Sequence, residues 1–112
     1  MPETSSLSSG PRDLTDLIDY QEGAVVSRTL LKTPGGTLTL FAFAEGQGLS
    51  EHSTPHEAYI LVLHGSARVT VGGTEHTVET GQALALPATV AHALTAEEPF
   101  KMLLTMLRQP TS

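Results

Sequence analysis

From residue 24 onward the sequence is a succession of short apolar segments separated by turn residues, and this spacing constrains the fold more than any other feature. The segment Thr37–Ala44 alternates between two kinds of side chain, the period-two pattern of a strand. Ala58–His64 is a continuous apolar run, as in a strand covered on both faces. Gly72 and Gly73 form a two-residue hairpin signal between two further segments. About eight or nine strands with turns roughly every 8–12 residues predict an all-β fold, an antiparallel sandwich or small barrel.

The predicted strands form a single domain. They cover residues 24–32, 37–44, 58–64, 67–71, 74–80, 82–87, 92–96 and 100–107. Residues 1–12 are rich in Ser, Pro and Gly and predict a flexible N-terminal tail, followed by one domain over residues 13–112 with its core at about 37–107. Residues 13–20 carry apolar side chains at helical spacing, which predicts a short helix or turn; a strand or irregular segment is the alternative.

Composition excludes several classes of function. The 112-residue chain has a formal charge of −6 and only six scattered Lys and Arg, so it lacks the basic footprint that nucleic-acid binding needs. It has no cysteine, which excludes disulfides and thiolate metal sites. No apolar run approaches the roughly 18 residues of a membrane span, and the polar start lacks signal-peptide features. We therefore expect a cytoplasmic protein that contacts neither membranes nor nucleic acid.

Three histidines are candidate metal ligands. His52 and His56 flank a proline loop that precedes a predicted strand, and His92 follows a second proline loop. If both loops lie at the same mouth of the barrel, three imidazoles converge, and imidazole suits divalent Fe, Mn, Ni, Cu or Zn. Three protein ligands leave positions open for water or substrate, as in catalytic sites. The alternative is that these are loop histidines with local hydrogen bonds, since this spacing also arises by chance.

Two motifs, in order and separated by a hairpin, make the chain resemble a small single-domain cupin of the RmlC-like jelly-roll type. The first motif matches at Gly46, His52 and Gly65, and the second at Gly81, Pro87 and His92. The resemblance covers about residues 24–107. It implies a jelly-roll fold with a divalent transition metal held by histidines at the barrel mouth, and a small-molecule ligand or substrate in the barrel.

The chain departs from the cupin ligand set at two positions. Thr54 stands where the family's second histidine falls, and Ala58 where its glutamate falls. If residue 58 points inward, alternation places 56 inward and 57 outward, which favours His56 as the replacement ligand. Glu57 remains the alternative, because an acid at this position resembles a recognisable cupin subgroup. Glu57 is also the candidate general base if the protein is an enzyme.

In the cupin barrel that this chain resembles, the inward face surrounds the site, which predicts the residues of the pocket wall. The resemblance does not decide the function. The candidate pocket residues are Ile60, Val62, Met102, Leu104 and Met106. One side of residues 37–44 adds either Leu38, Leu40 and Ala42 or Phe41 and Phe43; the simpler interpretation of all of these is core. A metal-dependent enzyme, similar to cupin dioxygenases or isomerases, and a non-catalytic ligand-binding, sensor or structural cupin are both compatible with the motifs. The resemblance and the exposed strand edges imply a homodimer with its contact in residues 14–32.

Overall fold

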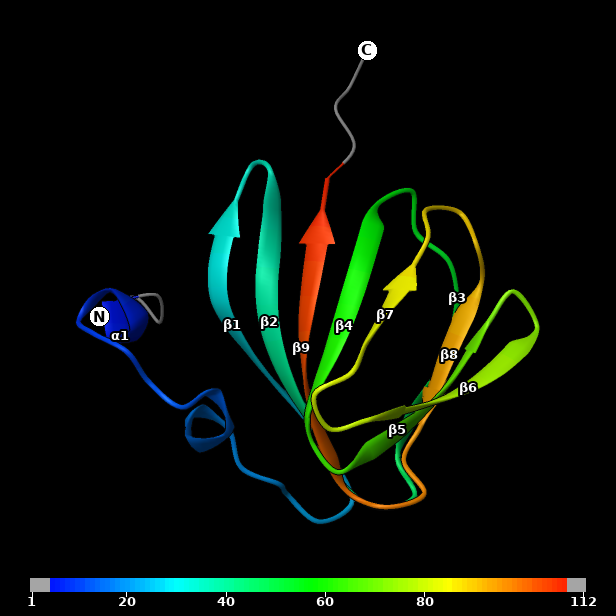
Figure 1. The fold of residues 1–112 in the computed structure, drawn as a ribbon, viewed down its shortest axis with the longest axis horizontal. Coiled ribbons are helices and arrows are strands. Elements are labelled where there is room, and N and C mark those ends of the chain that lie inside the picture. The colour runs from blue at the N-terminus through cyan, green and yellow to red at the C-terminus, as the bar shows by residue number, and fades with distance from the viewer. Residues whose placement is uncertain (1–4, 109–112) are drawn as a thin grey trace.

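The computed structural model describes residues 5–108, whose strands form two antiparallel sheets (Figure 1). The strands are β1 (Val25–Thr33), β2 (Gly36–Phe43), β3 (Gly48–His52), β4 (Glu57–His64), β5 (Ser66–Val71), β6 (Thr74–Glu79), β7 (Ala83–Leu86), β8 (His92–Thr95) and β9 (Phe100–Leu107). One sheet has the order β1-β2-β9-β4-β7 and the other β3-β8-β5-β6. This two-sheet arrangement confirms the predicted all-β sandwich.

The predicted glycine hairpin forms between β5 and β6. Val71 and Thr74 are paired across it, so Gly72 and Gly73 are the two loop residues. Their φ angles are 56° and 85°, the left-handed region that a type I′ turn requires at both positions. The sequence signal therefore fixed both the turn and the register of this strand pair.

The strand β3 is the element that the sequence pattern did not reveal. His52 was expected in a polar loop, but it is the last residue of β3 and pairs with His92 of β8. Four of the five residues of β3 are exposed, because β3 is an edge strand of the four-stranded sheet. An exposed edge strand has no need of apolar alternation, so its sequence resembles a loop.

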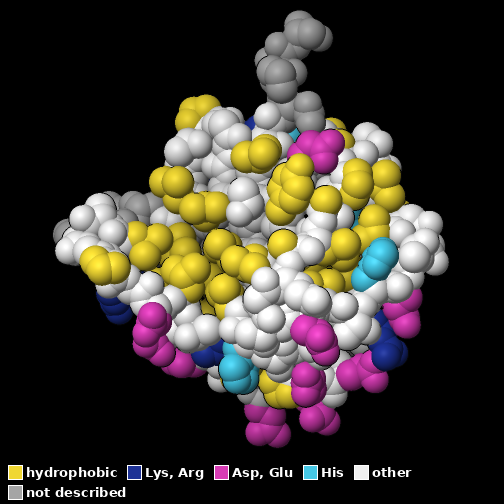
Figure 2. Space-filling view, viewed as in Figure 1, with side chains coloured by type: hydrophobic (Ala, Val, Ile, Leu, Met, Phe, Trp, Pro, Cys, Tyr) yellow, Lys and Arg dark blue, Asp and Glu magenta, His cyan; other side chains and the backbone are white. Residues whose placement is uncertain are grey.

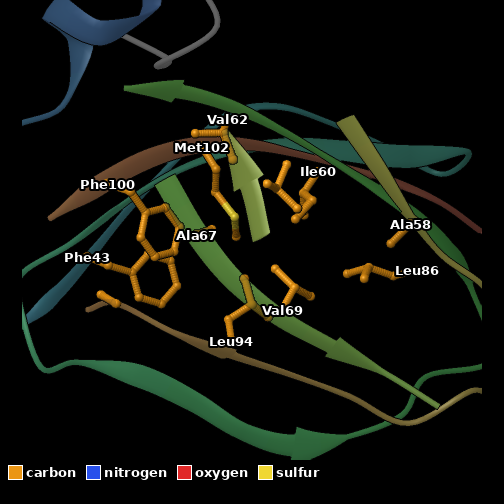
Figure 3. Close-up of a cluster of buried hydrophobic side chains, with 12 residues drawn as sticks. Phe43, Ala58, Ile60, Val62, Ala67, Val69, Leu86, Leu94, Phe100 and Met102 are labelled. Carbon is orange, nitrogen blue, oxygen red and sulfur yellow. The ribbon is translucent and has the colours of Figure 1, made fainter. Parts of the chain in front are cut away.

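The core fills the space between the sheets. Figure 3 shows its buried side chains, with Ala58 and Leu86 at one end and two stacked phenylalanines at the other. The rings of Phe43 and Phe100 are nearly parallel, with centroids 4.4 Å apart, and neither is solvent-exposed. Phe43 belongs to β2, so the inward side of this strand is the phenylalanine side, which resolves the alternative left open above.

A second apolar cluster covers part of the outer face of the five-stranded sheet. Leu40 and Ala42 of β2 lie there, beneath Leu17 and Ile18 of the N-terminal segment. This segment comprises one helical turn, α1 (Ser5–Ser8), and the 3-10 turn η1 (Leu14–Leu17). Within residues 5–108, no helix is long and apolar enough to cross a membrane.

Two side chains of the five-stranded sheet form hydrogen bonds to the backbone of the N-terminal segment. The Arg28 guanidinium donates to the carbonyl of Leu17 at 2.7 Å, and the Lys101 ammonium donates to that of Thr15 at 2.7 Å. The predicted helix or turn in residues 13–20 is thus a short 3-10 turn that packs on the sheet. Of the predicted tail, residues 1–4 lie outside the described residues, and Leu7 packs against the outer cluster.

Candidate functional site

A cavity of about 150 Å³ opens between the two sheets near the histidines. Its wall is mostly apolar and is formed by Phe41, Leu49, His52, Thr54, Ala58, Leu86, His92, Leu94, Met102, Leu104 and Met106. The polar groups among these side chains are two imidazoles and one hydroxyl. A small cavity with a few convergent polar groups is the usual form of a ligand site.

The four positions that correspond to cupin ligands all line this cavity. They are His52, Thr54, Ala58 and His92, and they come from β3, the β3–β4 loop, β4 and β8. Their convergence supports the register in which the motifs were matched. The cavity therefore has two imidazoles where four ligands are expected, with a hydroxyl and a methyl group in the other two places.

A β-bulge aims His52 into the cavity. Leu49 pairs with Leu94 and His52 with His92, so three steps along β3 correspond to two steps along β8. Without the extra residue, Glu51 would lie opposite His92 and His52 would point to the other face. The bulge thus places the two histidines directly opposite each other on one face of the sheet.

The two imidazoles meet through their Nε2 atoms. These atoms are 3.2 Å apart, and the rings are 4.4 Å apart in an edge-on arrangement. His52 Nδ1 lies 2.8 Å from the carbonyl oxygen of Ser50, and His92 Nδ1 lies 3.2 Å from that of Val90. A carbonyl oxygen only accepts, so these two contacts are hydrogen bonds in the tautomer whose Nδ1 carries the ring proton. When both neutral rings adopt that tautomer, two Nε2 lone pairs face each other.

Burial favours the neutral form of His92. Its side chain is 4% exposed, and desolvation lowers its pKa below the ordinary value of 6.5. The hydrogen bond to Val90 raises the pKa and the nearby His52 lowers it, but these effects are smaller. Burial of His92 therefore favours the form of this imidazole that can offer a lone pair to the cavity.

His56 and Glu57 do not join the pair in this arrangement. Neither lines the cavity, and within residues 5–108 no three His, Cys, Asp or Glu side chains lie close enough together to hold a metal ion. His56 precedes β4, and its backbone N–H donates to the hydroxyl of Thr54 at 3.2 Å. Glu57 alternates with the inward-facing Ala58 along β4, so it points away from the interior. The three-histidine cluster expected from the sequence is not assembled.

The predicted pocket wall divides into two parts. Met102, Leu104 and Met106 of β9 line the cavity as expected. Ile60 and Val62 also face inward, but they are fully buried in the core and do not line the cavity. The sequence reasoning missed Leu49 and Leu94, because they depend on the unrecognised β3 and its pairing with β8.

Comparison with known proteins places this fold in a family. The model of the cupin domain family matches residues 39–106. A conserved protein of unknown function from Streptococcus pyogenes is 32% identical over 92% of this chain and 90% of its own length, with a TM-score of 0.87. A cupin superfamily protein from Desulfitobacterium hafniense is 30% identical over 89% of this chain and 92% of its own, with a TM-score of 0.85.

A third similar structure belongs to a longer protein. The cupin 2 conserved barrel domain protein from Leptotrichia buccalis is 37% identical over 84% of this chain, with a TM-score of 0.81, and the match covers 46% of its length. Among curated proteins, none matches the chain. The family match spans more than half of the 112 residues and includes both motifs. This chain belongs to the cupin domain family.

Proposed function

We propose that this cupin binds a divalent transition metal through His52 and His92 and holds a small ligand in the adjoining cavity. The observation that carries the proposal is the convergence of two imidazole Nε2 atoms 3.2 Å apart at the cavity wall. Facing lone pairs repel unless a cation or a proton lies between them. The lowered pKa of His92 disfavours the proton.

The donor set fits such an ion. Neighbouring ligands about 2.1 Å from one metal lie roughly 3.0–3.4 Å apart for right-angled to tetrahedral coordination, and the two Nε2 atoms are 3.2 Å apart. Metal-binding histidines usually donate their other ring N–H to a carbonyl or carboxylate, as both rings do here. Bound there, the metal would act as a Lewis acid toward a ligand oxygen or nitrogen.

The cavity favours a ligand with a short apolar body and a polar head. A cavity of about 150 Å³ accommodates a molecule of roughly benzene size. Phe41, Met102 and Leu104 would contact the body, while the head would reach the two imidazoles and the Thr54 hydroxyl. Among residues 5–108, none of those that line the cavity carries a carboxylate to act as a general base, so a binding or sensing role stands beside an enzymatic one.

Metal retention by single variants tests the proposal. His52→Ala and His92→Ala should each abolish stoichiometric Co²⁺ or Zn²⁺ in elemental analysis of protein purified without a metal-binding tag. Each should also abolish the rise in Tm on metal addition, because a ligand that binds the folded state raises apparent stability. His64→Ala, an exposed histidine away from the cavity, is the matched control and should retain metal.

Two further variants decide the composition of the site. If His56→Ala or Glu57→Ala also removes the metal, the loop before β4 rearranges on binding and completes the ligand set. Retention in both variants leaves the histidine pair as the protein ligands. A wild-type protein whose Tm does not respond to Fe²⁺, Mn²⁺, Ni²⁺, Cu²⁺ or Zn²⁺ overturns the metal proposal.

We also propose that two copies associate through the outer face of the five-stranded sheet. Figure 2 shows hydrophobic side chains gathered over this sheet, and Leu31, Tyr59 and Leu107 are 41–49% exposed. Exposed apolar patches of this kind mark interaction sites. Much of the expected contact in residues 14–32 already packs on the chain's own sheet. Light scattering should give the mass of a dimer, and Tyr59→Asp should reduce it to that of a monomer.

A further inference from the structure

A strained backbone turn lies between the two strands that end at the cavity. Among residues 5–108, Thr89 is the one non-glycine residue with a positive φ, at 68°. It occupies the third position of the turn Pro87–Val90, which the Val90 N–H closes by donating to the Pro87 carbonyl at 3.2 Å. A positive φ at this position defines a type II turn, where glycine or asparagine is normally required. A β-branched residue is strained there.

The strained residue makes a hydrogen bond across the site. The Thr89 N–H donates to the carbonyl of Thr54 at 2.7 Å. Thr54 lines the cavity two residues after His52, and the next residue after Thr89, Val90, supplies the carbonyl that holds His92. One peptide unit therefore joins the loop after His52 to the turn before His92.

The relaxed form of this turn lacks that bond. Rotating the peptide between Ala88 and Thr89 converts a type II into a type I turn, in which Thr89 adopts an ordinary negative φ. The same rotation turns the Thr89 N–H away from Thr54 and directs the Ala88 carbonyl oxygen toward the Thr54 carbonyl oxygen. Strained backbone persists where surrounding contacts enforce it, and here the enforcing contact is the bond between the two loops.

We propose that Thr89 is a positioning residue whose strained turn holds the His52 and His92 loops together, and this inference rests on the proposed metal site. The turn sets the direction of the Val90 carbonyl, which fixes the His92 ring with Nε2 toward His52. The Thr89 hydroxyl donates to the Ala88 carbonyl, within the turn itself. The backbone N–H, not the hydroxyl, carries the effect.

Co²⁺ titration of three variants, followed by the visible absorption of the bound ion, tests the role of the N–H. Thr89→Gly keeps the N–H and suits the positive φ, so it should bind Co²⁺ as tightly as wild type and raise the Tm by about 4 °C. Thr89→Val removes only the hydroxyl and should leave the affinity unchanged. Thr89→Pro removes the N–H and cannot adopt the positive φ, so it should weaken binding at least tenfold.

A matched control separates positioning from general stability. Gly65→Ala strains the turn between β4 and β5, at the other end of the sandwich (Figure 1). It should lower the Tm while leaving Co²⁺ affinity within about twofold of wild type. Equal losses of affinity in Gly65→Ala and Thr89→Pro would reduce Thr89 to a structural role and overturn the proposal.

Hydrogen exchange in the wild type covers the case in which Thr89→Pro does not fold. If the closed turn favours metal, metal must favour the closed turn, because coupling is reciprocal. The Thr89 amide should therefore exchange at least threefold more slowly with Co²⁺ than without it, while the Gly81 amide, in a turn outside the cavity, should not change. An unchanged Thr89 rate in Co²⁺-bound protein overturns this inference, whereas an absence of Co²⁺ absorption overturns the metal site itself.

Discussion

Replacing Ala58 with glutamate should give the histidine pair a third protein ligand. Ala58 is 3% exposed and lines the cavity beside His52 and His92. At about 30 Å³ for a water-sized group, the cavity of about 150 Å³ holds roughly five such groups, and the substitution adds four heavy atoms. The carboxylate therefore has room to reach the Nε2 atoms without displacing the core.

The variant should lose stability without metal and regain it with metal. In the metal-free protein the new carboxyl faces Leu86 and Met102, and burying it costs about 1–3 kcal/mol. Metal at about 100 times its Kd stabilises the folded state by about 2.7 kcal/mol, and each tenfold gain in affinity adds about 1.4 kcal/mol. A third ligand should raise the affinity at least tenfold, so metal should stabilise Ala58→Glu more than wild type.

The assay is the Tm of each protein with and without Zn²⁺ at one fixed concentration. Ala58→Gln is the control for size, because its amide fills the same space without a charge. Ala85→Glu places the same carboxylate on β7, at an exposed position outside the cavity. The reasoning is refuted if the Zn²⁺-induced rise in Tm is no larger for Ala58→Glu than for Ala58→Gln.

The remaining predictions concern pH, packing and one turn. Because burial lowers the pKa of His92, this residue binds a proton more readily in the unfolded chain than in the folded one. Its contribution to the free energy of unfolding is therefore fully present above about pH 6.5 and is lost as the pH falls toward the lowered pKa. Urea unfolding of the metal-free protein should show this loss, which His92→Gln should diminish. Phe100→Ala should lower the free energy of unfolding by about 3–5 kcal/mol, because the ring is fully buried against Phe43; a loss below 1 kcal/mol would contradict the stacked core. Gly65→Ala should cost at least 1 kcal/mol in the same assay, since φ is 76° and a Cβ would collide with the Pro99 carbonyl; unchanged stability would contradict the turn.

Local sequence patterns predicted the strands β2 and β4 and the hairpin between β5 and β6. Both strands form where their apolar residues predicted them, but their burial differs from the expected patterns. The alternating strand β2 is buried on both faces, at Leu40, Ala42 and Phe43, whereas the continuous apolar run of β4 leaves Tyr59 44% exposed. The pair Gly72 and Gly73 marks a turn that needs two positive φ angles. At this turn the sequence and the structure express the same constraint, so the local pattern predicted it correctly.

The edge strand β3 was missed because its residues are exposed and carry no apolar alternation. The choice between His56 and Glu57 as a further ligand stays a prediction. Parity counted back from Ala58 favours His56, but neither residue lines the cavity in this arrangement. Regular alternation does not extend through the loop before β4, where Pro55 precedes His56.

The sequence by itself determined the all-β architecture, the family, and the positions His52 and His92 as the candidate pair. Only the tertiary structure decided that the two imidazoles face each other. That result depends on a bulge in β3, on the pairing of β3 with β8, and on two backbone carbonyls that lie beside the Nδ1 atoms of the two rings. The bulge and the register of β3 against β8 arise from contacts between strands about 40 residues apart in the sequence, so no local pattern of residues encodes them.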